Sequence, residues 1–391
     1  MELGAWSFYS GGSPALAATL RRMRLLDRYL LREILIPLGY CLGGFLLFWV
    51  AFNLISDLGD LQAHKMHGDD ILKYYLLKTP EFLVFVLPIG LLLALLYALT
   101  HHARHHEITA IRAAGVSLWR LCLPYFAVGL VGTVLLFVLN EYCVPQLSER
   151  AEQIKNRRTG EPQRLVQPFA FINARDGRTW GMRTYNPETG EMTAPQVYFT
   201  APDGSHHLIA ADRALRVDGI WTFYNARELH ETADNPALVP LLQTNQLAMP
   251  AFTETLEEIQ SEINVSRGMS SHGKFKADVP LSQILDYLRL HPRPPTSETR
   301  FWLYTKLHGR LAAPWTCLIV VLIAIPFGAA SGRRNVFVGV AGSILICFIY
   351  FVLQQAGLAL GTSGRVPSWL AAWFPNLIFG FTGILMTASV R

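Results

Sequence analysis

The stretch HHARHHEITAIRAAGVSLWR, residues 101–120, separates two long apolar runs and sets how the rest of the chain is interpreted. Apolar and small residues recur along one helical face: Ile108, Ile111, Gly115 and Leu118. Charged side chains, including that of Glu107, occupy the rest of the surface. This pattern predicts a short amphipathic helix outside the hydrocarbon of a membrane.

The composition indicates a membrane protein. Of 391 residues, 51% are hydrophobic and 16% are charged, against roughly 25% charged in soluble domains. Six segments without Asp, Glu, Lys or Arg each reach the roughly 20 residues that a helix needs to cross a bilayer. They are residues 34–56, 82–103, 121–140, 311–332, 335–364 and 366–390. We predict an α-helical polytopic membrane protein with a three-plus-three arrangement of spans around an inserted domain.

Positive charge in the short flanks predicts the orientation, because Lys and Arg are retained on the cytoplasmic side during insertion. Arginines crowd residues 21–32, the stretch 101–120 and the loop after the fourth span. We therefore expect both termini and the short helix, over about 104–119, in the cytoplasm. The expected parts are a tail (1–24), three spans (25–140), a domain on the opposite side (141–300) and three further spans (301–391). The tail has no signal-peptide pattern, and either Met1 or Met23 is a possible start.

The inserted stretch has the pattern of an all-β domain. Short strand-like runs alternate with turn sequences such as Asp-Gly, which is typical of a β-sandwich or an open barrel. The runs are residues 169–173, 179–185, 197–200, 207–211, 215–217 and 220–224. Helices are expected afterwards at 281–290 and 298–310, the second running into the fourth span.

The histidines of the opening stretch raise the question of a metal site, because two pairs stand at the i,i+4 spacing that can bind zinc. The pairs are His101 with His105 and His102 with His106. His106 and Glu107 also begin like HExxH, but Ala110 stands where the second histidine is required. Without a third ligand we predict no metal site and interpret these histidines as titratable charge at a membrane edge.

Other signals predict no chemistry. Residues 268–274, GMSSHGK, nearly spell a P-loop, but Phe275 replaces the residue that binds magnesium, so we expect a polar loop. The net charge of +5 comes with no basic stripe, which excludes nucleic acid as a partner. The cysteines lie in or beside apolar spans and read as core residues: Cys41, Cys122, Cys143, Cys317 and Cys347. No catalytic residues are found.

Three motifs together resemble the LptF/LptG (YjgP/YjgQ) family, the permease subunits of the bacterial lipopolysaccharide exporter. They are LLDRYLLRE at 25–33, HEITAIRAAGVSLWRL at 106–121, and Asn140-Glu141 followed by Val144-Pro145. The three-plus-three layout agrees with this family. The LeuAspArgTyr start and the fifth-span pattern favour the LptG branch over the LptF branch.

The resemblance implies a transport subunit without enzymatic activity, in the inner membrane of a Gram-negative bacterium, that extracts lipopolysaccharide. It implies a second LptF/LptG-type permease and an LptB-type cytoplasmic ATPase dimer, which would hold the ATP and magnesium, so that this chain binds no cofactor. It also implies a periplasmic β-jellyroll that passes the lipid to LptC and LptA-type bridge proteins. A scaffold without transport activity and an exporter of another lipid are the alternatives that the residues leave open.

The resemblance assigns candidate residues to three sites. The ATPase-coupling residues are Glu107, Ile111, Arg112 and Gly115. The lipid-gate candidates are Phe45, Trp49 and Phe52 in the first span and Phe348, Phe351 and Gln355 in the fifth. The first span lacks the basic residues that G-type members often carry there, so the lipid-phosphate candidates are Lys65, Lys73 and Arg365. Gly39 and Gly43 form a GxxxG pair that predicts close helix packing in the first span.

Overall fold

The computed structural model describes residues 25–64, 66–156, 169–173, 176–186, 189–201, 204–232, 235–270, 279–291, 296–329 and 336–389. The expectations for the tail 1–24, for Lys65 and for most of the P-loop-like segment lie outside these residues.

Six helices among the described residues are long and apolar enough to cross a membrane, which confirms the three-plus-three arrangement. The first half contains α2 (Leu25–Ser56), α4 (Gly68–Arg104) and α6 (Leu118–Val138), with the short α3 (Leu58–Ala63) between the first two. The second half contains α10 (Ser297–Ala312), α11 (Thr316–Ala329), α12 (Val336–Thr362) and α13 (Ser368–Ser389). A single 3₁₀ turn at Ala313–Trp315 joins α10 to α11, so the fourth span begins in the polar segment, as expected.

The third span is longer than its apolar segment. After α6 the helix passes through a π-helical turn, Leu139–Cys143, and continues as α7 (Val144–Asn156). The sequence predicted the end of this span at residue 140, just before the first charged residue, Glu141. Hydropathy marks where a helix leaves the hydrocarbon, but it does not mark where the helix ends.

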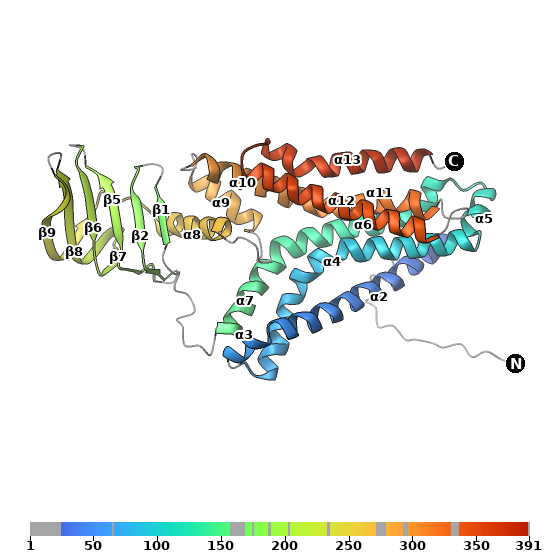
Figure 1. Ribbon diagram of the computed structural model, residues 1–391, viewed down its shortest axis with the longest axis horizontal. Coiled ribbons are helices and arrows are strands. Elements are labelled where there is room, and N and C mark those ends of the chain that lie inside the picture. Colours follow the sequence, from blue (N-terminus) through green and yellow to red (C-terminus); the bar gives the residue numbers. More distant parts are fainter. Residues whose placement is uncertain are drawn as a thin grey trace.

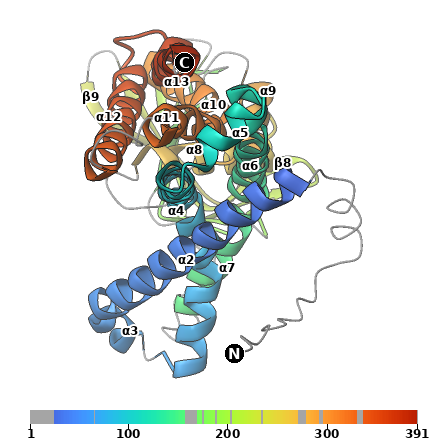
Figure 2. The ribbon, with the colours of Figure 1, turned by 90° about the vertical axis from the view of Figure 1, so that its right-hand side faces the viewer.

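Helix α4 is the centre of the membrane part, because it packs against both α2 and α11. Its small and apolar side chains, such as Ala94, Leu95 and Ala98, are fully buried there. In contrast, α2 buries only Leu30 and Ile34 within the described chain and leans away from the helices of the second half (Figures 1 and 2). Helix α2 therefore contacts α4 along one side, and much of the rest of its surface is exposed within the described part of the chain.

A polar network joins the second-half helices inside the apolar region. The Tyr350 hydroxyl donates to Asn376 Oδ1 at 2.5 Å and lies 2.8 Å from the Thr316 hydroxyl. The Asn376 amide donates to the carbonyl of Ala312 at 2.9 Å. These groups satisfy one another where no water is available, and so fix α11, α12 and α13 together.

The inserted domain is a nine-stranded antiparallel sheet, which confirms the expected inserted all-β domain. Its strands are β1 (Phe169–Ile172), β2 (Thr179–Met182), β3 (Thr184–Tyr185), β4 (Met192–Thr193), β5 (Gln196–Thr200), β6 (His206–Ala210), β7 (Arg213–Val217), β8 (Ile220–Thr232) and β9 (Asn235–Met249). The order is β1-β2-β5-β6-β8-β7-β4-β3, and β9 pairs with β8. The first part of β8 pairs with β7 and its second part with β6, so the sheet bends around a shared core.

Aromatic side chains fill this core. Trp180, Trp221 and Phe223 are fully buried between the two sides of the sheet and pack on Phe252, which follows β9. The sequence runs located most strands, but the run 179–185 is divided at Arg183 and β4 and β9 were missed. Pro240 weakened the strand pattern of β9, and it is tolerated because β9 lies at an edge, where a missing N–H breaks no ladder bond.

Two helices connect the sheet to the membrane part. Helix α8 (Leu256–Ser270) was not expected, whereas α9 (Leu281–Leu290) agrees with the predicted range. A side chain at Gly268 would collide with Val279 and Trp302, so the start of the P-loop-like segment is packed helix and not a phosphate loop.

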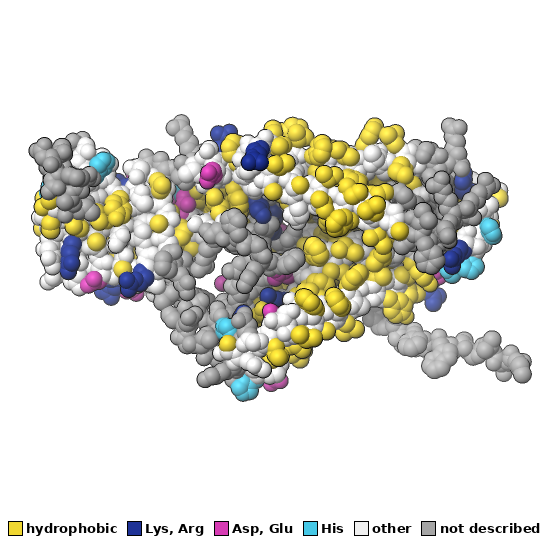
Figure 3. All heavy atoms as spheres, viewed as in Figure 1, with side chains coloured by type: hydrophobic (Ala, Val, Ile, Leu, Met, Phe, Trp, Pro, Cys, Tyr) yellow, Lys and Arg dark blue, Asp and Glu magenta, His cyan; other side chains and the backbone are white. Residues whose placement is uncertain are grey.

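The two polar ends of the molecule lie far apart. The sheet forms one end, and α5 (Glu107–Ala113) forms the other, next to the start of α2 and the end of α13 (Figure 1). Between them, hydrophobic side chains cover much of the visible surface of the helices, while Lys, Arg and His gather toward the ends (Figure 3). This is the distribution expected of a protein that crosses a membrane.

Candidate functional site

The stretch quoted first forms α5, a helix held between two sharp turns. After α4, His106 adopts φ 57°, and α5 begins at Glu107. Gly115 follows α5 with φ 85°, a conformation that glycine adopts without strain and that ends helices. The Ser117 hydroxyl then accepts a hydrogen bond from the backbone N–H of Arg120 and caps α6. The short helix is thus 107–113, within the expected 104–119.

The Glu107 carboxylate is held in place by two side chains. Its Oε2 accepts hydrogen bonds from His102 Nδ1 at 2.7 Å and from the Tyr29 hydroxyl at 3.0 Å. Burial raises the pKa of this carboxyl. Hydrogen bonds from His102 and Tyr29, together with the charges of nearby imidazoles, lower the pKa by more than burial raises it, so the pKa lies below its usual range. Glu107 is therefore a fixed negative charge at the first turn of α5.

An ion pair joins the same elements a few residues away. Arg120 Nη2 donates to Asp27 Oδ2 at 2.8 Å, linking the start of α6 to the start of α2. Tyr29 and Asp27 both belong to LLDRYLLRE, whereas Glu107 and Arg120 belong to the second motif. The two stretches that carry the family resemblance therefore lie in contact, although 78 to 93 residues separate the paired side chains.

The remaining coupling candidates differ in exposure. Arg112 and Gly115 are exposed, so they are available to another protein, whereas Ile111 is half-buried and packs against the core of the membrane part. Ile108 is buried beside it. The apolar face of α5 therefore attaches the helix to its own chain, and the opposite face is free for a partner.

Sequence reasoning missed Tyr29, His102 and Asp27 as members of this site. Tyr29 and Asp27 stood within a quoted motif, but no spacing relates them to residue 107. His102 was considered as a metal ligand and then interpreted as titratable charge at a membrane edge, whereas it is 2% exposed and hydrogen-bonded to Glu107. The signal that could have found them is the charge of Asp27 and His102 beside apolar spans, which requires a partner.

The lipid-gate candidates do not form one wall within this chain. Phe52 and Phe348 are exposed, at 60% and 64%, and Gln355 is exposed as well. Trp49 and Phe351 instead turn toward α4. Phe45, the sixth candidate, is half-buried.

Two aromatic residues of α4 receive the inward-facing candidates. The Trp49 ring stacks on Phe82 at 4.7 Å, and Phe351 lies 6.4 Å from Phe85. Helices α2 and α12 lie on different sides of α4 (Figure 2). Among the described residues, the candidates of α2 and α12 therefore do not meet.

The lipid-phosphate candidates are spread along one end of the membrane part. Lys73 is exposed on the first turns of α4, and Arg365 is exposed in the turn between α12 and α13. Lys78, which was not proposed, is half-buried on α4 with its ammonium 5.0 Å from the Tyr74 ring. The structure does not bring these cations together into one site.

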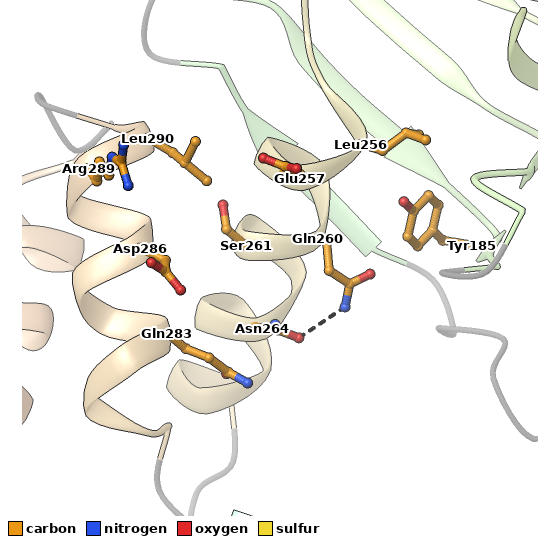
Figure 4. A pocket seen from close by; sticks show the side chains of 10 residues that line it. All are labelled: Tyr185, Leu256, Glu257, Gln260, Ser261, Asn264, Gln283, Asp286, Arg289 and Leu290. Carbon is orange, nitrogen blue, oxygen red and sulfur yellow. Dashed lines mark hydrogen bonds between the residues drawn. The ribbon is translucent and has the colours of Figure 1, made fainter. Parts of the chain in front are cut away.

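A groove of about 770 Å³ lies between α8, α9 and the sheet, apart from all these residues (Figure 4). Acidic and amide side chains line it together with one arginine, Arg289. In Figure 4 the Gln260 amide donates to Asn264 Oδ1, at 3.2 Å, along one wall. The groove offers no cluster of positive charge for an anionic lipid.

The family model of the lipopolysaccharide export system permease LptF/LptG matches residues 28–388. The chain belongs to this family. It is 21% identical over 363 residues to the lipopolysaccharide export system permease protein LptF of Escherichia coli strain K12, covering 91% of this chain and 92% of that protein. LptF of Shigella flexneri matches to the same extent. Family membership makes the chain a multi-pass permease of the inner membrane. The preference for the LptG branch stays a prediction.

Proposed function

We propose that the chain is one permease subunit of an ATP-driven lipopolysaccharide exporter. The LptF/LptG family is one of lipopolysaccharide export permeases, and the match to the relative of that name covers 91% of this chain and 92% of that protein. In the proposed assembly this chain pairs with a second LptF/LptG-type permease and sits on a dimer of an LptB-type ATPase, which binds ATP and magnesium.

The observation that carries the ATPase-docking part is the construction of α5. A short helix lies at the end opposite the sheet, attached by its apolar face, with Arg112 and Gly115 exposed and Glu107 held ionised. A fixed charge on an exposed helix is suited to docking in a complementary groove, because little side-chain entropy is lost on binding. We assign α5 as the element that receives movement from the ATPase.

The exposed face of α2 supports the pairing with a second permease. A side chain added at Gly39 or Gly43 would meet no described atom of this chain within 4 Å. We therefore propose that these two glycines allow close packing against a helix of another protein. Phe52 is exposed on another side of the same helix, and a lipid gate between α2 of one permease and α12 of the other accounts for the separation of the candidates in this chain.

The proposed orientation follows the positive charge near α5. The α5 end faces the cytoplasm with both termini, and the sheet faces the periplasm, where it receives the lipid and hands it to LptC and LptA-type proteins. Lys73 and Arg365, near the periplasmic end of the spans, are proposed to contact lipid phosphates as the cargo leaves the outer leaflet.

Co-purification tests the assembly. The tagged chain is expressed with the second permease and ATPase of its own organism, and we expect a stable complex that hydrolyses ATP and releases lipopolysaccharide from proteoliposomes. A chain that retains neither partner would support the scaffold alternative. Identification of the co-purified lipid by mass spectrometry distinguishes lipopolysaccharide from another lipid.

Replacement of Glu107 tests the coupling role. Glu107→Ala is expected to lower ATPase retention or to uncouple hydrolysis from release, because the fixed charge at the start of α5 is lost. Thr109→Ala is the matched control, since Thr109 is exposed on the same helix. Unchanged assembly and release in the Glu107 variant would contradict this role.

A further inference from the structure

The turn between α4 and α5 brings a third potential metal ligand to two histidines. One ligand atom each of His101, His105 and Glu107 lies within 4.8 Å of the others. The sequence pattern required a ligand at position 110, which is alanine. The fold instead supplies a carboxylate from position 107, because the chain reverses at His106 before α5 begins.

The His105 ring is oriented as metal-binding histidines are. Its Nδ1 lies 2.9 Å from the carbonyl oxygen of His101. Since a carbonyl only accepts, Nδ1 carries the proton and Nε2 keeps a free lone pair. Metal-ligating histidines commonly donate their other nitrogen to a backbone carbonyl, which fixes the tautomer. The His101 ring lies 4.3 Å from the His105 ring, on the preceding turn of α4.

The carboxylate is also positioned in advance. His102 and Tyr29 place their two shorter hydrogen bonds on Oε2 of Glu107, and only the longer 3.3 Å contact from Tyr29 reaches Oε1. An ionised carboxylate has about four lone-pair sites, so Oε1 retains acceptor capacity. His102 is buried, and a buried donor behind a ligating carboxylate is the outer-shell arrangement found in metal sites.

We propose that His101, His105 and Glu107 form a site for a divalent transition-metal ion, with Zn²⁺ as the best fit. Two imidazoles and one carboxylate favour zinc over magnesium or calcium, which prefer oxygen ligands alone. Bonds of about 2.1 Å place tetrahedral donors about 3.4 Å apart, so the ligand atoms, now within 4.8 Å of one another, have to approach by up to about 1.4 Å. His105 is exposed, so a fourth ligand position would be accessible to water or to a group from another protein.

A bound ion would tie the last turn of α4 to the first turn of α5. The orientation of α5 then depends on metal as well as on the hydrogen bonds of Glu107. All three ligands belong to this chain, so metal binding does not require that α5 docks on an ATPase.

Metal titration of the purified full-length chain tests the site. The chain carries a tag without histidine, is treated with a chelator in detergent, and is titrated with Co²⁺, followed by competition with Zn²⁺. We expect one dominant site per chain with the visible absorption of low-coordinate Co²⁺. His101→Ala, His105→Ala and Glu107→Gln should each weaken binding at least 10-fold. Tyr29→Phe, which loosens the carboxylate, should weaken it by a smaller factor.

His106→Asn is the matched control. His106 is adjacent and exposed, and asparagine tolerates its positive φ, so this variant should bind Co²⁺ like the native chain. In the same samples, Zn²⁺ should slow hydrogen exchange of amides 105–110 in the native chain and leave the His105 variant unaffected. Equal Co²⁺ binding by native and His105→Ala chains, or an equal loss in His106→Asn, would overturn the proposal.

Discussion

The Glu141 carboxylate accepts a hydrogen bond from the backbone N–H of Leu281 at 2.8 Å, so a residue of the third span caps helix α9. A second bond, from the N–H of Ser282, measures 2.9 Å. The helix needs this outside acceptor because the residue before it, Pro280, has no side chain that can cap. Arg310 approaches the same carboxylate at 3.9 Å and donates to the carbonyl of Asn140 at 2.8 Å. Glu141 thus joins the two halves of the membrane part to the connection with the sheet.

Glu141→Ala is expected to loosen α9 without unfolding the chain. Loss of an N-terminal cap costs about 1 kcal/mol, which corresponds to faster amide exchange in α9 by about 5-fold. Hydrogen exchange of the detergent-purified chain measures this. Glu149→Ala, at an exposed position of α7, should leave α9 unchanged. Identical exchange of α9 in both variants would show that Glu141 is not its cap.

Arg178 is expected to be essential for the stability of the sheet domain. Its guanidinium lies 3.3 Å from Oε1 of Glu254, which is 1% exposed and also accepts from Trp180. Arg178→Met leaves that carboxylate without its cation, a change that costs about 3–5 kcal/mol in buried pairs. Arg213→Met removes an exposed pair with Glu191 at 3.6 Å and should cost less than about 1 kcal/mol. Thermal unfolding of the two variants measures both losses of stability.

Glu262 gives the sheet end a dependence on pH. Burial raises its pKa from 4.5 to about 7, although the Tyr287 hydroxyl, which donates to it at 2.9 Å, opposes the shift. His291 Nε2 also faces this carboxylate, at 3.4 Å. Between these two pKa values the folded chain binds more protons than the unfolded chain, so the stabilisation from protonated Glu262 is present at low pH and is lost as pH rises through about 7.

Glu262→Gln should remove this dependence, because the amide keeps the shape without the charge. Relative to the native chain, the variant should gain about 1–3 kcal/mol between pH 5 and pH 8. The midpoint of thermal unfolding, measured across that range, reports the difference. Glu257→Gln, exposed on the same helix, should follow the native curve. A constant offset between the Glu262 variant and the native chain would argue against the raised pKa.

Photocrosslinking tests the lipid-gate assignment. A benzophenone side chain at Phe52 or Phe348 should form adducts with lipopolysaccharide in cells, because both positions are exposed on the proposed gate helices. Val131 is the matched control, since it is 66% exposed on α6, which belongs to neither gate helix. Similar adduct yields at all three positions would indicate general exposure to lipid.

The spans and most strands were predictable because they rest on local patterns. Charge-free segments located all six membrane helices, and alternation with Asp-Gly turns located strands such as β6 and β7. The elements that the sequence did not predict depend on tertiary contacts. The helix after Asn140 persists because α7 packs against α4, and β9 exists because β8 provides a full-length partner.

The candidate site was predictable at Glu107 but not at its partners. A motif identifies a residue, whereas the contacts of Tyr29 and His102 with that residue require the approach of α2 to the end of α4. The same limit applies to the metal ligands. Position 107 was not considered as a ligand because a helix-based motif assumes that the helix continues, and here it is interrupted at His106.

The third span has a mechanical consequence that follows from its length. From Leu118 to Asn156 the helix runs without a loop, which at 1.5 Å per residue amounts to about 58 Å, nearly twice the roughly 30 Å hydrocarbon thickness. One end is separated from α5 by four residues, and the other continues past Glu141 to lie beside α3 and the start of α4, where Ala151 packs with Leu61 and Tyr74. About the π turn at Leu139–Cys143, the 21 residues of α6 form a longer arm than the 13 residues of α7, so a rigid tilt about this turn would move the end beside α5 farther than the end at Asn156.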